Sequence, residues 1–203
     1  MDARTLIYLL RHGAVDLGGT RRFIGHLDLP LSPEGERQSA AQATRLRAAR
    51  FAAVFASDLS RARRTAEIIA APHALHPTLL PALREMDMGR WDGLSSAEIE
   101  AREPIAFAEW MAHIGRFPFP GGESVGDLLD RAWPAFEAIA EHYHGGTVAV
   151  VAHGGTNRAL LCRALGLPAD RLLTFGQDYG ALSVLERVRE EWRLRLLNES
   201  PAL

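Results

Sequence analysis

The sequence predicts an α/β fold in which helices cover both faces of a mostly parallel sheet. Three short apolar runs, at Leu6–Leu10, Ala52–Ala56 and Thr147–Ala152, are typical of strands that are buried on both faces. Two later runs, Leu182–Glu186 and Trp192–Leu196, predict the strands of a hairpin. Helical patterns lie between the first three runs, and this alternation indicates an α/β sandwich.

Two helices are expected in the first half of the chain. The pair Ser32-Pro33 is typical of a cap and a first-turn proline, and it predicts a helix that continues to about Ala49. A second helix is expected from Ser60 to about Ala71, where Pro72 ends it.

Two more helices are expected in the second half. Ser124 and Asp127 form a capping box, and apolar residues recur on one helical face from position 125 to position 143. Pro134 lies inside this helix and should kink it or break it. The other helix is expected over Gly154–Leu165, and Gly166 closes it.

Length and composition narrow the class of protein. The 203 residues predict a single domain over 1–203 with a short lid or insertion around 86–122. The net charge is −2, and the basic residues are not concentrated in one half of the chain, so the charge does not favour a nucleic-acid partner. The one cysteine, Cys162, excludes an internal disulfide and a cysteine-rich metal site. The apolar run near the N-terminus is too short for a signal peptide or a membrane span, so we expect a cytoplasmic protein with no membrane partner. A homodimer is left open.

Chemically active side chains follow the three buried strands. Arg11 and His12 follow the first strand, and Arg61 follows the second within a short turn. His153 and Gly154 follow the third. Because the carboxyl ends of parallel strands meet at one edge of a sheet, we expect two histidines and two arginines to share one crevice.

These residue types suit the transfer of a phosphoryl group. Guanidiniums present forks of donors that match phosphoryl oxygens, and a helix that begins at Gly154 adds backbone N–H groups. A neutral imidazole at His12 is a competent nucleophile toward phosphorus. His153, if it is protonated, would stabilise charge on the transferred oxygens.

A general acid for the leaving alkoxide is also needed. Glu85 is the best candidate, because it lies in a short loop-like segment before a Gly-x-Trp-x-Gly turn. The residues alone do not choose Glu85 over Asp87 or Asp58, and these alternatives stay open here.

Six motifs in order connect the chain to a known family. They are Leu10-Arg11-His12-Gly13, Gly25-x-x-Asp28-x-Pro30-Leu31-Ser32-x-x-Gly35, Ser57-Asp58-Leu59-x-Arg61-Ala62-x-x-Thr65-Ala66, Glu85-x-x-x-Gly89-x-Trp91-x-Gly93, Pro120-Gly121-Gly122-Glu123-Ser124 and His153-Gly154-Gly155. With these motifs the chain resembles the histidine phosphatase superfamily, in its phosphoglycerate-mutase-like branch, over essentially its whole length.

The resemblance implies a role for each matching residue. It implies a phosphorylated nucleophile at His12, a phosphoryl group held by Arg11, Arg61 and His153, and an acid and base at Glu85. It also implies a three-layer α/β/α sandwich that needs no metal and no cofactor.

Some positions depart from the family pattern. Many members have Glu-Thr after Arg-His-Gly and an asparagine three residues beyond, whereas this chain has Ala14, Val15 and Gly18. A glutamine that is common before Thr65 is Arg64 here. The departures change the polar contacts expected at the rim of the phosphate site, but they leave both histidines in place.

Several other residues have two interpretations. Arg22 and Gly25 are expected to contact the substrate, although Arg21 and Arg22 could equally be solvated loop charges. The pairs His73/His76 and His142/His144 have spacings that a metal could use, but neither pair has a third ligand nearby, so we expect no metal site.

The reaction expected is hydrolysis of a small phosphorylated metabolite. Only residues 94–119 separate Gly93 from Pro120, whereas the mutases of this branch carry a longer lid there. Mutases also tend to have Ser or Thr before Gly-Trp where this chain has Ile24-Gly25-His26. The chain is similar to the α-ribazole-5′-phosphate phosphatases of cobalamin synthesis and to their broad-specificity relatives. The alternatives are mutase-type phosphoryl transfer and a non-catalytic module that binds phosphoesters.

Overall fold

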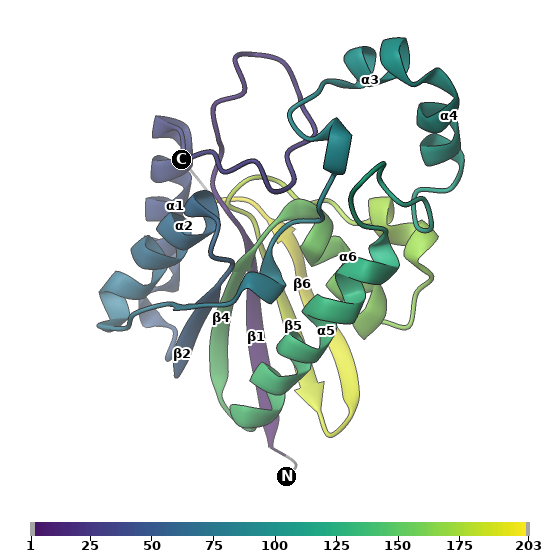
Figure 1. Cartoon of the computed structure of the whole chain (residues 1–203). Coiled ribbons are helices and arrows are strands. Elements are labelled where there is room, and N and C mark those ends of the chain that lie inside the picture. Colours follow the sequence, from purple (N-terminus) through teal and green to yellow (C-terminus); the bar gives the residue numbers. More distant parts are fainter. Residues whose placement is uncertain (1–2, 202–203) are drawn as a thin grey trace.

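One six-stranded sheet forms the centre of the molecule in the computed structural model, which describes residues 3–201 (Figure 1). The strands are β1 (Arg4–Arg11), β2 (Ala53–Ala56), β3 (Thr78–Leu79), β4 (Thr147–Ala152), β5 (Leu182–Val188) and β6 (Glu191–Glu199). Their spatial order is β3-β2-β4-β1-β5-β6. The sheet is mostly parallel, since β1, β2, β3 and β4 run in one direction and β5 pairs antiparallel with β1 and β6. The predicted hairpin is therefore confirmed, and it forms one edge of the sheet.

Helices cover both faces of this sheet. The helices are α1 (Pro33–Arg45), α2 (Ser60–Ala70), α3 (Ser96–Arg102), α4 (Pro104–Ala112), α5 (Val125–His142) and α6 (Gly154–Ala164). Short 3-10 turns connect them at Leu46–Ala48, Ala71–His73, Pro81–Leu83, Gly89–Trp91 and Ala169–Thr174. Figure 1 shows α1 and α2 on one side of the sheet and α5 and α6 on the other, so the three-layer α/β/α sandwich is confirmed.

Alternating side chains of the central strands divide the core into two parts. On β4, Val148 and Val150 pack into the cluster that contains α5 and α6, whereas Ala149 and Val151 pack into the cluster that contains α1 and α2. This alternation explains why β4 is an unbroken apolar run in the sequence, since both of its faces are buried.

The helix α5 differs from one expectation. The capping box of Ser124 and Asp127 is confirmed, but the helix is continuous through Pro134 rather than broken there. Proline removes one backbone donor, so the carbonyl of Asp130 loses its intrahelical partner. Both Asp130 and Pro134 are exposed, so water can bond to that carbonyl at little cost.

The segment between β3 and α5 contains helices that the sequence analysis did not predict. In Figure 1, α3 and α4 stand above the edge of the sheet at which β1, β2 and β4 end. An aromatic cluster joins them to the body, because the buried ring of Trp91 contacts Phe107, Trp110 and Phe117. Residues 113–124 form no helix or strand, as expected for the glycine- and proline-rich stretch.

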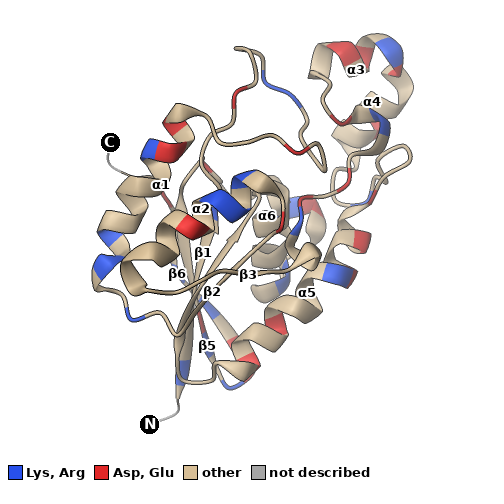
Figure 2. Cartoon of the chain, turned by 60° about the vertical axis from the view of Figure 1, so that its left-hand side comes forward, with Lys and Arg blue, Asp and Glu red and all other residues tan. Residues whose placement is uncertain are grey.

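The surface carries both signs of charge. Figure 2 shows acidic and basic residues interspersed along the outer faces of α1, α2 and α5. No helix within residues 3–201 is long and apolar enough to cross a bilayer.

Candidate active site

The predicted crevice is a cavity of about 550 Å³ at the carboxyl edge of the sheet. Six residues that the sequence analysis singled out line it: Arg11, His12, Arg22, Arg61, Glu85 and Gly154. His153 is fully buried directly behind, with its ring centroid 5.1 Å from that of His12. Side chains that lie far apart in the sequence thus meet where parallel strands end, as topology requires.

His12 lies just after β1 and is almost completely buried. Its Nδ1 is 2.7 Å from the carbonyl oxygen of Gly13, and only a protonated Nδ1 can donate to a carbonyl. The neutral ring then carries its lone pair on Nε2. Burial, and after it the positive charges of Arg11 and Arg61, hold the pKa of His12 well below its ordinary value of 6.5. His12 is therefore a neutral imidazole with a free nucleophilic nitrogen.

His153 caps the N-terminal end of α6 without a hydrogen bond from its side chain. Both ring nitrogens are buried and have no partner among residues 3–201. Burial, and then the charges of Arg61 and His12, hold its pKa well below 6.5. Protonation of His153, which the sequence analysis considered, therefore requires a nearby anion such as a phosphoryl group. Attraction to that anion would offset the cost of burial and the repulsion by Arg61.

Arg11 is held on two sides. Its Nη1 donates to the carbonyl of Gln177 at 2.5 Å, and its guanidinium stacks on the ring of Tyr179 at 3.8 Å from the centroid. Its buried Nε has no partner among the described residues. An unpartnered buried donor costs about 1–3 kcal/mol, so a ligand oxygen at this point would be stabilised.

Arg61 is fixed by the turn that the second motif builds. Its two terminal nitrogens donate to the carbonyls of Leu27 and Gly25 at 2.8 and 2.7 Å. Asp92 orders the same turn, because its two oxygens accept from the backbone N–H groups of Gly25 and Leu27. The buried Nε of Arg61 has no partner within residues 3–201 and remains for a ligand.

The carboxylate of Glu85 is held at the start of α6. Its Oε2 accepts from the backbone N–H of Gly155 at 2.8 Å, and its Oε1 accepts from the N–H of Thr156 at 3.0 Å. Oε1 also accepts from its neighbour Met86 and from the hydroxyl of Thr156. These donors at the start of the helix hold the carboxyl group of Glu85 in one orientation.

Two glycines make this arrangement sterically feasible. A Cβ atom at Gly155 would lie 2.5 Å from Oε1 of Glu85, closer than real Cβ contacts occur. A Cβ at Gly154 would lie 3.3 Å from both Arg11 Nε and Arg158 Nη1. The Gly-Gly pair after His153 therefore lets charged groups approach the helix end from two sides.

The two other candidate acids are engaged elsewhere. Asp58 forms a pair of hydrogen bonds with Arg84 at 2.7 and 2.6 Å, and the bond to Arg84 lowers its pKa. Asp87 accepts from the N–H of Gly89 and faces His26. Neither aspartate lines the cavity, so Glu85 alone of the three faces it.

The two substrate contacts expected from the sequence have different outcomes. Arg22 lines the cavity, but its Nη1 is bound to the carbonyl of Gly93 and to Glu98 at 2.9 and 2.8 Å. Gly25 does not line it and supports Arg61 from behind. A Cβ at Gly25 would lie 2.5 Å from the carbonyl oxygen of Met86, so a glycine is required there for packing.

Tyr179 and Arg158 line the cavity at its charged floor, and neither was named as a site residue from the sequence. Tyr179 lies after the 3-10 turn that follows α6, and no local pattern places it against Arg11. Arg158 lies one turn after Gly154, and helix side chains lean toward the N-terminus, so its spacing was a usable signal.

The wall opposite the charged floor is apolar. It is built from the loop after β1, the segment around α4 and the turn after α6, and includes Phe23, Met88, Trp110, Ile114, Phe119 and Leu172. A ligand that binds here would place an anionic group on the floor and an apolar body against this wall.

The two histidine pairs with spacings that suit a metal do not line the cavity. His73 packs on Phe51, and His142 packs on Tyr143. Within residues 3–201 no cluster of three or more His, Cys, Asp or Glu side chains could hold a metal ion.

The lowered pKa of His12 predicts how its protonation responds to pH. A base with a depressed pKa stays neutral as the pH falls through its ordinary value of 6.5 and is protonated only at lower pH. The NMR signal of the His12 ring should therefore not titrate between about pH 8 and pH 6, with His12→Ala used to assign it. A midpoint near 6.5 would contradict the buried, cation-flanked environment.

Comparison with known proteins agrees with this geometry. The family model of the histidine phosphatase superfamily (branch 1) matches residues 7–200. The bifunctional protein Rv2228c of Mycobacterium tuberculosis is 37% identical over 183 residues, which cover 90% of this chain and 50% of that protein. A probable phosphoglycerate mutase, GpmB of Salmonella choleraesuis, is 35% identical over 80% of this chain and 76% of its own length. The chain thus spans about half the length of the first of these curated relatives.

Solved structures have the same fold along nearly the whole chain. A putative α-ribazole-5′-P phosphatase from Escherichia coli has a TM-score of 0.88 at 25% identity and covers 98% of both chains. A mycobacterial glucosyl-3-phosphoglycerate phosphatase, Rv2419c, has a TM-score of 0.87 at 30% identity and covers 97% of this chain and 100% of its own.

Proposed function

This chain belongs to branch 1 of the histidine phosphatase superfamily. From this premise we propose that it is a phosphatase that hydrolyses monoesters of small phosphorylated metabolites through a phosphohistidine at His12. One observation carries the proposal. His12 is a neutral imidazole with Nε2 free, Arg11 and Arg61 line the same cavity, and His153 is buried directly behind it.

In the first step, Nε2 of His12 attacks phosphorus and the bond from phosphorus to the ester oxygen breaks. Arg11 and Arg61 bind the phosphoryl oxygens through their unpartnered Nε groups. The protonated carboxyl of Glu85 transfers its proton to the leaving oxygen. Oε2 is the better placed oxygen for that proton, because it accepts one hydrogen bond whereas Oε1 accepts three.

In the second step, water attacks the phosphohistidine and the P–N bond breaks. Glu85, now a carboxylate, takes a proton from the attacking water. The electron pair of the P–N bond returns to Nε2 of His12, and inorganic phosphate leaves. The same carboxyl therefore serves as acid and then as base, and the donors at the start of α6 hold it in one place throughout.

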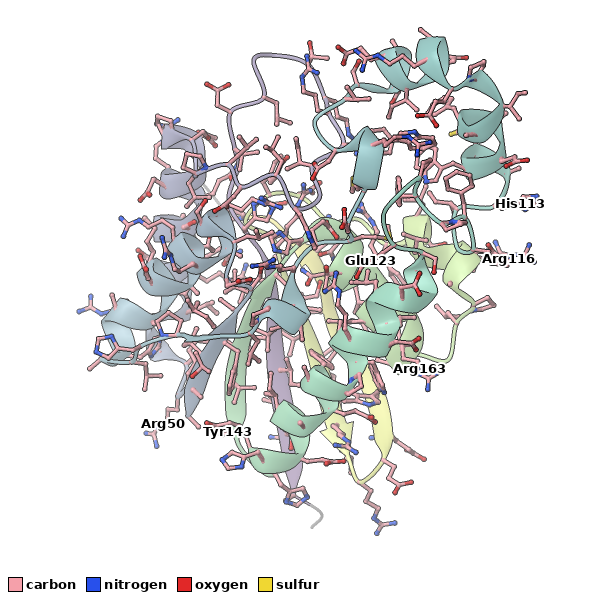
Figure 3. The ribbon with its side chains drawn as sticks, in the orientation of Figure 1. Arg50, His113, Arg116, Glu123, Tyr143 and Arg163 are labelled. Carbon is pink, nitrogen blue, oxygen red and sulfur yellow. The ribbon has the colours of Figure 1, made fainter. Side chains whose placement is uncertain are left out.

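We also propose that the segment 86–122 acts as a short lid. It carries α3 and α4 over the cavity, and Figure 3 shows His113 and Arg116 at its outer end and Glu123 where the chain enters α5. Glu123 is bound by Arg131 at 2.7 Å and accepts from the N–H of Asp87, so it anchors the lid rather than meeting substrate. A lid of this length leaves access for water.

The leaving group fits the apolar wall. An aromatic or aliphatic body would contact Trp110 and Phe119, and α-ribazole 5′-phosphate is one candidate with such a body, suggested by the neighbour from Escherichia coli. A phosphorylated glycerate derivative is a second candidate, suggested by the neighbour Rv2419c.

A panel of phosphorylated metabolites tests the proposal directly. Purified protein should release inorganic phosphate from several monoesters, α-ribazole 5′-phosphate and 3-phosphoglycerate included. Conversion of 3-phosphoglycerate to 2-phosphoglycerate without phosphate release would show mutase activity instead. Tight binding of phosphoesters with neither outcome would identify a non-catalytic module.

Inhibitors provide a prediction about the chemistry. Activity should survive EDTA, because every step above uses side chains alone. Vanadate should inhibit competitively, since a trigonal-bipyramidal anion in contact with Arg11 and Arg61 mimics the transition state. The measurement is phosphate release with and without each reagent. Loss of activity in EDTA with recovery on adding zinc or magnesium would contradict the mechanism.

A further inference from the structure

Arg158 is a cation at the cavity that the mechanism above does not use. It lines the cavity from the first turns of α6 and is half-buried. Its Nε donates to the carbonyl of Phe175 at 2.8 Å, which fixes the plane of the guanidinium. Its terminal nitrogens have no carboxylate at ion-pair distance among residues 3–201. The side chain is thus held in place while its Nη1/Nη2 edge stays available.

The cavity carries more positive charge than one phosphoryl dianion neutralises. Five arginines and one glutamate line it: Arg11, Arg21, Arg22, Arg61, Arg158 and Glu85. Arg22 is neutralised by Glu98, and a phosphoryl dianion balances Arg11 and Arg61. Arg21 and Arg158 remain, and even when Glu85 is a carboxylate and offsets one of them, one positive charge is left over. Asp178 lies nearby but outside the cavity, where Asn198 and Ser200 bond to its carboxylate.

The surplus charge lies on one side of the phosphoryl site. Arg61 is anchored to the turn of Gly25 and Leu27, whereas Arg158 is anchored to Phe175 after α6. Arg21 adds to this second side, because its charge acts on both Arg11 and Arg158. A guanidinium edge with two parallel N–H groups matches the two oxygens of a carboxylate.

The cavity also has exposed apolar side chains in its lining. Met111 and Leu173 line the cavity yet are 63% and 61% exposed. An apolar body that packs against them would cover both side chains, and a carboxylate attached to it would lie within the cavity rather than in water.

We propose that Arg158, assisted by Arg21, binds a carboxylate on the leaving group, and that the preferred substrates are phosphomonoesters with an apolar body and a carboxylate. This inference rests on the proposed function and narrows it. Among the candidate substrates, it favours carboxylated compounds over α-ribazole 5′-phosphate, which has no carboxylate.

Matched aryl phosphates test the inference. Phenyl phosphate serves as the neutral reference, and 3- and 4-carboxyphenyl phosphate place the carboxylate at two positions on the same ring. Wild-type protein should have a higher kcat/KM for at least one carboxylated ester than for phenyl phosphate. Arg158→Gln should lower that kcat/KM by about ten- to a hundredfold, the range of a hydrogen bond to a charged group. The loss on phenyl phosphate should be much smaller.

Two further variants separate charge from structure. Arg158→Lys keeps the positive charge and should recover part of the preference. Arg163→Gln removes an exposed arginine from the outer side of the same helix, as Figure 3 shows, and should change neither substrate. Because each variant is compared on both esters, the intrinsic reactivity of the leaving groups cancels.

The outcomes distinguish this inference from the proposed function. Equal losses on both esters in Arg158→Gln would overturn it, since Arg158 would then bind the phosphoryl group or support the loop at Phe175. No wild-type preference for either carboxylated ester would overturn it as well.

If wild-type protein hydrolyses none of the esters, the proposed function fails. The subsite is then tested by calorimetry, which compares the binding of benzylphosphonate with that of 4-carboxybenzylphosphonate. Equal affinities there would overturn the inference.

Discussion

Replacing His12 with alanine should lower the turnover of every phosphomonoester by at least about 10⁴-fold, because no other group takes over the attack on phosphorus. The ring that is removed carries the free Nε2, and His153 behind it has no opening onto the cavity. A radiolabelled substrate should leave acid-labile, base-stable label on the wild-type protein and none on His12→Ala.

The fold must survive for this result to be informative. Circular dichroism and thermal melting should show that His12→Ala remains folded. His144→Ala is the matched control, because His144 is exposed in the turn before β4. Label that persists on His12→Ala would place the nucleophile at another residue, with His153 the first to examine.

Glu85→Gln should have an effect that depends on the leaving group. An alkyl phosphate leaves as a strongly basic alkoxide and needs the proton, whereas p-nitrophenolate leaves without one. Phosphorylation of His12 by alkyl phosphates should fall by roughly 10²–10⁴-fold, the range for general acid catalysis, and by much less with p-nitrophenyl phosphate. Single-turnover measurements are needed, because Glu85 is also proposed to activate water in the second step.

Two comparison variants make this result specific. Arg61→Ala should impair both substrates alike, because Arg61 contacts the phosphoryl group common to them. Asp87→Asn changes a neighbouring carboxylate that does not line the cavity and should leave the ratio of the two rates unchanged. Equal losses on both substrates in Glu85→Gln would show that Glu85 is not the acid, and Asp87 and Asp58 would be reconsidered.

The central strands were predictable because their burial leaves a direct trace in the sequence. The central residues of β1 and β4 pack into cores on both faces, so the runs Leu6–Leu10 and Val148–Ala152 are apolar. The helix α4 leaves no such trace, since none of its side chains is fully buried. The strand β3 has two exposed residues and is defined by backbone pairing with Phe55 and Ala56. The capping box of Ser95 and Glu98 at the start of α3 was a readable signal that the sequence analysis missed.

The site was predictable to the extent that strand ends position it. Arg11 and His12 directly follow β1 or end it, so the parallel topology alone brings them to the cavity. The place of Glu85 depends on the loop that packs against α6, and no spacing between distant segments encodes that contact. Tyr179 depends in the same way on the path of the chain after α6. Gly25 belongs to one of the family motifs, but it is required for packing and does not line the cavity. A motif match therefore does not by itself identify a residue that contacts the ligand.

The position of β4 in the sheet also constrains how the protein is made. This strand is inserted between β1 and β2, although more than 130 residues separate its start from the end of β1. A nascent chain that has not yet extended past Ala152 leaves the apolar edges of β1 and β2 without their shared neighbour, and such edges favour aggregation. His12, which is synthesised before β4, can meet His153 only after this insertion. Recovery of enzymatic activity during refolding should therefore report the completion of the whole sheet, later than the formation of helices.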